Sequence, residues 1–328
     1  MIKDPIYGSF ELEPVLTDLL QSRPVQRLRG VHQGGSSYLV NPKWNVTRYE
    51  HSVGVMLLVK RMGGSIEEQM AALLHDVSHT AFSHVSDFAL RNLEEDYHEQ
   101  IFRRVIEESE IPDILHNYGY TTEQIFNDFS KWTILEQPSP DLCADRIDYT
   151  IRDQFHYFDL NIEEIQKLLE SLTVQNGLLC FKTLEAAERF TKLYYQEVID
   201  FFMDPLNAYG NWKLSIAIRL GLRKKILKMD DLLKDDQGVW SILQQSKDPD
   251  MRQIMRQIHP NVDVVTDEKN YDYSIKNKPR LLDPMVVHNG ITVRASAISK
   301  VVGKLNETAI ERFKRGARIR VVSFYKAE

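Results

Sequence analysis

Side chains that could bind a metal ion are concentrated in the first third of the chain. Six of the ten histidines fall between residues 32 and 98: His32, His51, His75, His79, His84 and His98. The pair His75-Asp76 follows an apolar helical stretch, where a buried carboxylate beside an imidazole needs a compensating cation or hydrogen-bond partner. Imidazole and carboxylate donors without a thiolate suit iron, manganese, zinc or magnesium. The sequence therefore predicts a catalytic metal site that includes His51, His75 and Asp76.

One more carboxylate ligand has to come from a distant element, and Asp145 is the best candidate. On an ideal helix, the side chains of Asp145, Arg146, Tyr149 and Asp153 fall within an arc of about 100°. We interpret the charges of Asp148 and Arg152, at i and i+4, as a structural ion pair. For any one of the histidines taken alone, a satisfied core residue remains the alternative to a ligand.

Capping signals predict the helices that carry these residues. Thr47, with Glu50 three positions later, forms a capping-box pattern and predicts a helix from Arg48 to Met62. We therefore interpret Glu50 as a capping residue and not as a catalytic one. The run 63–65, Gly-Gly-Ser, ends that helix and opens a second one that reaches His75-Asp76. Further helical periodicity lies near residues 85–93, 98–107, 122–129, 140–155, 162–172, 184–203 and 213–227. Strand-like segments lie near residues 177–181, 285–287 and 318–324.

The composition indicates a globular and mainly helical protein. The chain has 328 residues, 43% of them hydrophobic and 27% charged, and a net charge of −6 that argues against wholesale binding of nucleic acid or an anionic membrane. Two cysteines cannot form a disulfide framework, and no apolar signal or membrane segment is found, so we expect a cytoplasmic protein.

The composition shifts near residue 230. We predict a helical domain over residues 1–225, with a core at about 45–160, and a small mixed α/β appendage over residues 226–328; the boundary falls between about 225 and 260.

Four motifs, in order, resemble the HD-domain metal-dependent phosphohydrolases. The motifs are the runs 48–52 (Arg-Tyr-Glu-His-Ser), 74–84 (Leu-His-Asp-Val-Ser-His-Thr-Ala-Phe-Ser-His), 145–149 (Asp-Arg-Ile-Asp-Tyr) and 152–153 (Arg-Asp). Within that family the pattern is similar to the deoxynucleoside triphosphate (dNTP) triphosphohydrolases, including the animal enzyme with an added sterile-alpha-motif domain. The resemblance implies an HD-domain helical bundle, a divalent metal (manganese, magnesium, iron, zinc or nickel) and a homo-oligomer, a dimer or tetramer.

The resemblance also implies a reaction and a role for each matching residue. Metal-activated water attacks the α-phosphorus of a dNTP, and triphosphate leaves intact. The implied metal ligands are His51, His75, Asp76 and Asp145. The implied general acid is His84, with Asp87 and His98 as its hydrogen-bonded neighbours. The implied phosphate and sugar contacts are Gln33, Arg48, His79, Arg146, Tyr149 and Asp153.

Two departures from the triphosphohydrolase pattern concern specificity. Gly34 replaces a bulky apolar residue beside the sugar, so we expect a gap there and a preference for deoxyribose of about 100-fold or less. The acidic residue that reads guanine in the activator site of the animal enzyme has Gln21 as its nearest counterpart, which makes activation by guanine nucleotides doubtful.

Two other functions remain open. One is a nucleotidase or phosphomonoesterase of the same superfamily, because the metal motif does not specify which phosphorus is attacked. The other is a nucleic-acid-binding protein that uses the basic strip 21–61 and the basic tail 312–320.

Overall fold

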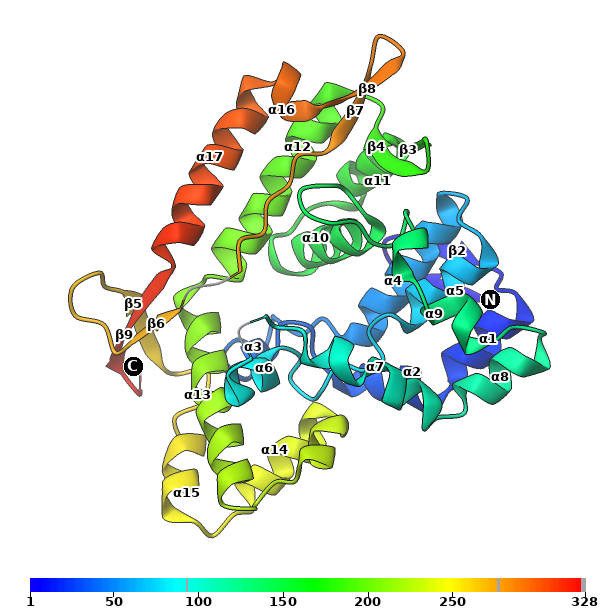
Figure 1. Cartoon of the computed structure of the whole chain (residues 1–328). Helices are drawn as coiled ribbons and strands as arrows, with labels where there is room; N and C mark the ends of the chain where they lie inside the picture. The colour runs from blue at the N-terminus through cyan, green and yellow to red at the C-terminus, as the bar shows by residue number, and fades with distance from the viewer. Residues whose placement is uncertain (93, 276–277, 326–328) are drawn as a thin grey trace.

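The computed structural model describes residues 1–92, 94–275 and 278–325, and these form a mainly helical fold with small C-terminal sheets, as predicted (Figure 1). The helices are α1 (Pro14–Gln21), α2 (Arg23–Arg27), α3 (Ser37–Val40), α4 (Arg48–Arg61), α5 (Ile66–Leu74), α6 (Val85–Leu90), α7 (Tyr97–Glu107), α8 (Ile111–Asn117), α9 (Thr122–Phe126), α10 (Ala144–Tyr157), α11 (Ile162–Glu170), α12 (Leu184–Tyr195), α13 (Pro205–Arg223), α14 (Asp236–Gln244), α15 (Pro249–Met255), α16 (Ala295–Ile298) and α17 (Lys300–Arg315). Shorter 3₁₀ turns are η1 (Leu28–Gly30), η2 (Phe129–Lys131) and η4 (Met229–Leu233), and η3 (Gln196–Phe201) is a π-helix. Residue 93, the predicted end of the helix 85–93, lies outside the described residues.

The strands form small, separate sheets. They are β1 (Ile2–Asp4), β2 (Gly8–Phe10), β3 (Leu172–Gln175), β4 (Leu178–Phe181), β5 (Asp263–Thr266), β6 (Tyr273–Ile275), β7 (Met285–His288), β8 (Ile291–Arg294) and β9 (Ala317–Ser323). β1 and β2 form an antiparallel hairpin; the second sheet has the order β3-β4-β7-β8, with only the β4–β7 pair parallel. In the third sheet, β9 lies between β5 and β6 and is antiparallel to both.

The two helices that carry the first two motifs begin as the capping signals predict. Thr47 Oγ1 accepts the Glu50 N–H, and the Glu50 carboxylate accepts the Thr47 N–H. Glu50 is therefore a capping residue, and α4 begins at Arg48. The next helix, α5, begins after Ser65, whose hydroxyl accepts the Glu68 N–H, and it ends directly before His75.

Some predicted boundaries are wrong. The third-motif helix, α10, begins at Ala144 and not near residue 140. The helix expected at 213–227 spans Pro205–Arg223, because the Asp204 carboxylate caps its N-terminus and Pro205 tolerates the first helical position. In Figure 1 the long helix α17, which the composition of the basic tail did not indicate, packs beside α12.

The region after residue 225 packs onto the segment that precedes α6. Leu232 and Val239 are buried in one hydrophobic cluster with Phe82 and Val85. The domain boundary near residue 225 stays a prediction, but residues on its far side adjoin the segment that contains His84. Within the described ranges, no helix is both long enough and apolar enough to cross a bilayer.

Candidate metal centre

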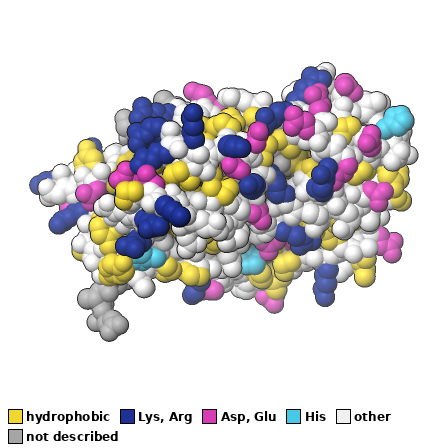
Figure 2. Space-filling view, turned by 90° about the horizontal axis from the view of Figure 1, so that it is seen from below, with side chains coloured by type: hydrophobic (Ala, Val, Ile, Leu, Met, Phe, Trp, Pro, Cys, Tyr) yellow, Lys and Arg dark blue, Asp and Glu magenta, His cyan; other side chains and the backbone are white. Residues whose placement is uncertain are grey.

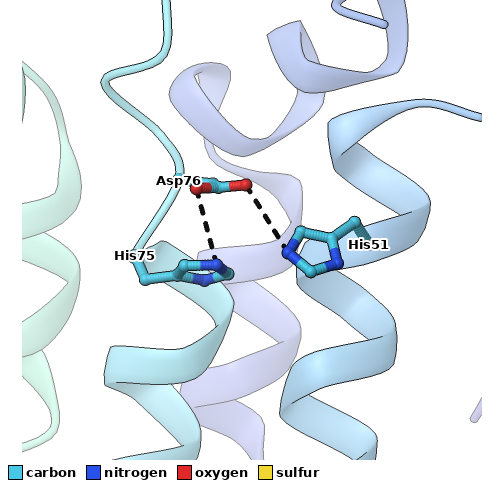
Figure 3. Close-up of side chains that lie close together, drawn as sticks. All are labelled: His51, His75 and Asp76. Carbon is cyan, nitrogen blue, oxygen red and sulfur yellow. Dashed lines mark ion pairs between the residues drawn. The ribbon is translucent and has the colours of Figure 1, made fainter. Parts of the chain in front are cut away.

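Four predicted ligands lie together where α4, α5 and α10 meet. His51 Nε2 is 3.0 Å from Asp145 Oδ1 and 3.8 Å from Asp76 Oδ2. His75 Nε2 is 3.5 Å from Asp76 Oδ1 and 3.7 Å from Asp145 Oδ1. Figure 3 shows both imidazole rings directed toward the Asp76 carboxylate, His51 from α4 and His75 from the end of α5. Side-chain exposure rises from 1% at His51 to 23% at Asp145, so the cluster opens toward Asp145.

In both histidines a hydrogen bond at Nδ1 directs the other ring nitrogen, Nε2, into the cluster. His75 Nδ1 lies 2.7 Å from the Ala72 carbonyl oxygen, so it carries the proton, and its buried Nε2 has no hydrogen-bond partner. His51 Nδ1 lies 2.9 Å from Asp148 Oδ2, so the Nδ1–H donates to that carboxylate and Nε2 is directed into the cluster. A histidine ligand commonly uses its second ring nitrogen in this way.

Asp148 has a role that the sequence did not indicate. Its predicted ion pair with Arg152 is confirmed, with Arg152 Nη2 2.9 Å from Asp148 Oδ1, but both side chains are completely buried. The second oxygen of Asp148 orients His51, and Arg152 also contacts the Asp4 carboxylate of β1 at 3.1 Å. A side chain at Gly54 of α4 would collide with Asp148 and Arg152, so glycine there allows α10 to approach α4.

The electrostatics of the cluster favour a cation. Burial disfavours a charged His51 ring, but its hydrogen bonds to Asp145 and Asp148 outweigh burial and raise the pKa of His51 to about 10. Burial also opposes ionisation of Asp76, but Arg48, whose Nη1 lies 2.6 Å away, and the neighbouring histidines hold the pKa of Asp76 well below its usual range. A metal ligand must offer a lone pair, so a bound cation would replace the proton of His51.

The geometry fits a divalent metal ion. Around an ion with bonds of about 2.1 Å, two ligands are about 3 Å apart at right angles and about 4.2 Å apart on opposite sides, and the donor separations of 3.0–3.8 Å fall within this range. In two other groups the donor atoms also lie within 4.8 Å of one another. These groups are His84–Asp87–His98 and Glu136–Cys143–Asp145. In the last group the Arg146 guanidinium lies 2.9 Å from Cys143 Sγ and already supplies a positive charge. The best metal site among the described residues is therefore the group His51–His75–Asp76, with Asp145 3.0 Å from His51 and 3.7 Å from His75.

A second imidazole cluster adjoins the metal donors. The rings of His79 and His98 are stacked at 3.8 Å, and the His84 ring meets both edge-on. His79 Nε2 lies 3.3 Å from Asp76 Oδ1 and so connects the two clusters. Burial and His84 lower the pKa of His98 to about 4, and burial and Arg48 hold the pKa of His79 well below its usual range, so both rings are neutral at pH 7.

Asp87 holds His84 in place. Its carboxylate lies 3.0 Å from His84 Nδ1 and also accepts hydrogen bonds from the Asn92 amide and the Tyr97 N–H. His84 is thus oriented by a buried carboxylate with its other ring nitrogen available, an arrangement suited to an acid.

The structure distributes the predicted substrate residues unevenly. Arg48 lies beside Asp76, and Tyr149, which is part of α10, packs against Phe202. Arg146, in contrast, donates from Nη1 to the carbonyl oxygens of Gln137 and Asp141, so its guanidinium binds the loop before α10.

The predicted gap beside Gly34 is wrong. A Cβ atom at that position would collide with Ser37 Oγ and lie 3.2 Å from the Phe201 ring, so both side chains fill the space. Gln33 Oε1 is buried without a partner. The Asp153 carboxyl is also buried, and burial raises its pKa to about 7.

Two further polar residues near the site come from the C-terminal region and were missed. Asp236 accepts hydrogen bonds from His32 and Phe82. Arg280 Nη2 lies 3.6 Å from Glu95 Oε2, and its Cζ is 5.4 Å from the centre of the Phe202 ring, against which Tyr149 also packs. No local motif marks either residue, since both reach the site only through folding.

Comparison with known proteins identifies the family. A sequence model of the HD domain matches residues 48–153. The metal-dependent phosphohydrolase cns2 of Cordyceps militaris is 35% identical over 302 residues, and the match covers 88% of this chain and 86% of that protein. The chain belongs to the HD-domain metal-dependent phosphohydrolases.

Other similar proteins differ in how much of their length matches this phosphohydrolase. The uncharacterized protein YdhJ of Bacillus subtilis is 50% identical over 321 residues, 98% of this chain and 99% of that protein. The deoxynucleoside triphosphate triphosphohydrolase SAMHD1 of Bos taurus is 28% identical over 221 residues, and the match covers 52% of this chain and 38% of that protein. The crystal structure of a hypothetical protein from Aquifex aeolicus shares the fold, with a TM-score of 0.69 at 23% identity over 95% of this chain and 98% of the other.

Proposed function

We propose that this phosphohydrolase acts on nucleotides, with removal of triphosphate from a dNTP by attack of water on the α-phosphorus as the first candidate reaction. The observation that carries the proposal is the oriented His84–Asp87 pair next to the metal donors, since it supplies an acid for a leaving oxygen beside a site for a cation. The similarity to a named dNTP triphosphohydrolase, though limited to 38% of that protein, supports the choice of substrate.

The residues divide the chemistry between them. His51, His75, Asp76 and Asp145 would hold a divalent cation, which, when bound, supplies the Lewis acidity that ionises water near neutral pH. Arg48, held by Asp76 and Ser83, offers positive charge to phosphate oxygens. His84 donates a proton to the departing alkoxide, and Asp87 orients the ring for that transfer.

A phosphomonoesterase or nucleotidase is the second candidate, and two observations favour it. One relative that matches over most of its length, cns2, is named as a metal-dependent phosphohydrolase without a nucleotide substrate. Arg146, which the triphosphohydrolase pattern assigns to phosphate, instead binds backbone carbonyls of the preceding loop.

Nucleic-acid binding has less support. In the predicted basic tail, Arg318 pairs with Glu268 at 3.1 Å and Arg320 with Asp267 at 3.3 Å, which offsets part of its charge. On the face seen in Figure 2, basic side chains are interspersed with acidic ones. We keep homo-oligomerisation as a prediction.

The test is a product analysis. The protein, loaded with Mn²⁺ or Mg²⁺, is incubated with dNTPs, rNTPs and nucleoside monophosphates, and the products are separated by chromatography; protein with excess chelator is the control. We expect a deoxynucleoside and inorganic triphosphate. Orthophosphate released from monophosphates would select the second candidate, and the absence of any metal-dependent product would refute both.

A further inference from the structure

We propose that Asp236, outside the matched HD segment, is a positioning residue that holds two loops next to the metal centre. These loops are residues 31–36 and 79–84, and the proposed function places them on the side where the substrate binds. The inference rests on the proposed function, which places Arg48 and His84 against the substrate. Asp236 is the first residue of α14 and is 1% exposed. Its Oδ2 accepts the backbone N–H of His32 at 3.0 Å and lies 2.8 Å from His32 Nδ1, while its Oδ1 accepts the Phe82 N–H at 2.6 Å.

The bond to Phe82 supports an unusual turn between His79 and His84. Phe82 and Ser83 have φ values of 60° and 51°, the left-handed region that non-glycine residues seldom adopt. Such a conformation persists only where its surroundings enforce it. Ser83 Oγ donates to the His32 carbonyl oxygen at 2.7 Å and accepts from Arg48 Nε at 2.8 Å. The Asp236 carboxylate is thus joined through this turn to Arg48, and His84 follows directly.

Neighbouring contacts show that the segment 232–236 joins both loops. The Ala81 N–H donates to the Leu232 carbonyl oxygen at 2.8 Å. Arg27 donates to the carbonyl oxygens of Lys234 and His79, at 3.1 and 2.6 Å. In the other loop, Gly30 approaches Asp235 so closely that a Cβ atom would lie 2.8 Å from Asp235 Cβ.

The metal ligands depend less on this segment. His51 lies on α4, Asp145 on α10, and His75 directly follows α5, and the hydrogen bonds of these three residues do not involve Asp236. The fourth ligand, Asp76, is joined to the turn through Arg48 and not through Asp236 directly. Loss of the Asp236 carboxylate should therefore disturb the substrate side and leave metal binding intact.

The experiment compares Asp236→Asn with the matched control Asp235→Asn. Asparagine has one acceptor oxygen, so its NH₂ group must face an N–H donor of His32 or Phe82. Asp235 caps α14 through a 2.8 Å bond from the Gly238 N–H, a role that asparagine fills equally well. Three quantities are measured on the full chain: bound Mn²⁺, affinity of the Mn²⁺-loaded protein for inorganic triphosphate, and hydrogen exchange of peptides over residues 31–36 and 79–84.

We expect Asp236→Asn to bind triphosphate roughly 10- to 100-fold more weakly, since it leaves a buried donor unsatisfied. Exchange in both peptides should be faster, bound Mn²⁺ should be unchanged, and Asp235→Asn should match the wild type. Wild-type exchange in both peptides, or a loss of Mn²⁺ equal to the loss of triphosphate affinity, would overturn the inference.

If Asp236→Asn does not fold, His32→Ala is tested in its place. This variant removes the ring N–H that Asp236 accepts and keeps the backbone N–H of residue 32. Faster exchange over residues 31–36 with full Mn²⁺ supports the inference, and unchanged exchange overturns it. None of these measurements uses nucleotide turnover, so a failure of the proposed function is recognised separately, by wild-type protein that hydrolyses no nucleotide.

Discussion

Asp148 provides a sharp test of how the metal centre is built, because one carboxylate serves both a ligand and a buried cation. Oδ2 orients His51, and both oxygens accept from Arg152 at 2.9–3.0 Å. Asp148→Asn keeps the shape of the side chain but removes its charge and one acceptor oxygen. The NH₂ group of the new side chain must then face either the imidazole proton of His51 or the guanidinium of Arg152.

Two separate losses follow from the contacts. Arg152 is completely buried and, among the described residues, would keep Asp4 as its one carboxylate partner; breaking a buried pair costs about 3–5 kcal/mol. This is a large part of the 5–15 kcal/mol by which domains are typically stable. Removing the carboxylate behind a ligating imidazole typically weakens metal binding by about 10- to 100-fold. We therefore expect both a less stable metal-free protein and a weaker metal site.

Urea unfolding in the presence of chelator measures the first loss, and calorimetric titration with Mn²⁺ measures the second. Asp87→Asn is the matched control, because Asp87 is a buried carboxylate behind an imidazole, His84, in the neighbouring cluster. The control should keep wild-type affinity for Mn²⁺. Wild-type Mn²⁺ affinity in Asp148→Asn, or equal weakening in both variants, would refute the reasoning.

Three further changes test other parts of the site. Asp145→Asn should lose most bound metal and turnover while keeping its fold; full metal by elemental analysis with unchanged activity would exclude Asp145 as a ligand. His84→Ala should slow turnover by about 10²–10⁴-fold and keep its metal, whereas loss of metal would make His84 a ligand. Burial and Asp153 raise the pKa of Glu197, so the folded protein keeps a proton that the unfolded chain releases above about pH 4. The contribution of Glu197 to stability should therefore fall as the pH rises above about 5, so the melting temperature of the wild type should fall relative to that of Glu197→Gln; equal pH dependence of the two melting temperatures would contradict this.

The grouping of the metal donors could be predicted because local signals place most of them. The capping box before Arg48 sets the start of α4 and so the position of His51, and the helix that Ser65 caps ends directly at His75. Asp236 has no comparable signal, since its partner His32 lies 204 positions away and only tertiary packing joins them. Asp148 was interpreted from its i,i+4 spacing to Arg152, which was correct for the pair but could not show that α4 brings His51 to its other oxygen.

The expectation about Gly34 failed for the same physical reason. A glycine leaves a gap only if no other part of the chain fills the space of the missing side chain. The sequence shows that the side chain is missing, but it does not show which residues pack into that space. Here the space is taken by Ser37, in the next turn, and by Phe201, whose ring lies 5.2 Å from that of Trp44 and 5.0 Å from that of Tyr157. A leucine at position 34 would have to displace this packed ring, so that substitution would test packing and not sugar selection. The sequence around Gly34 could not show this, because the π-helix η3 brings Phe201 to the loop from a distant part of the chain.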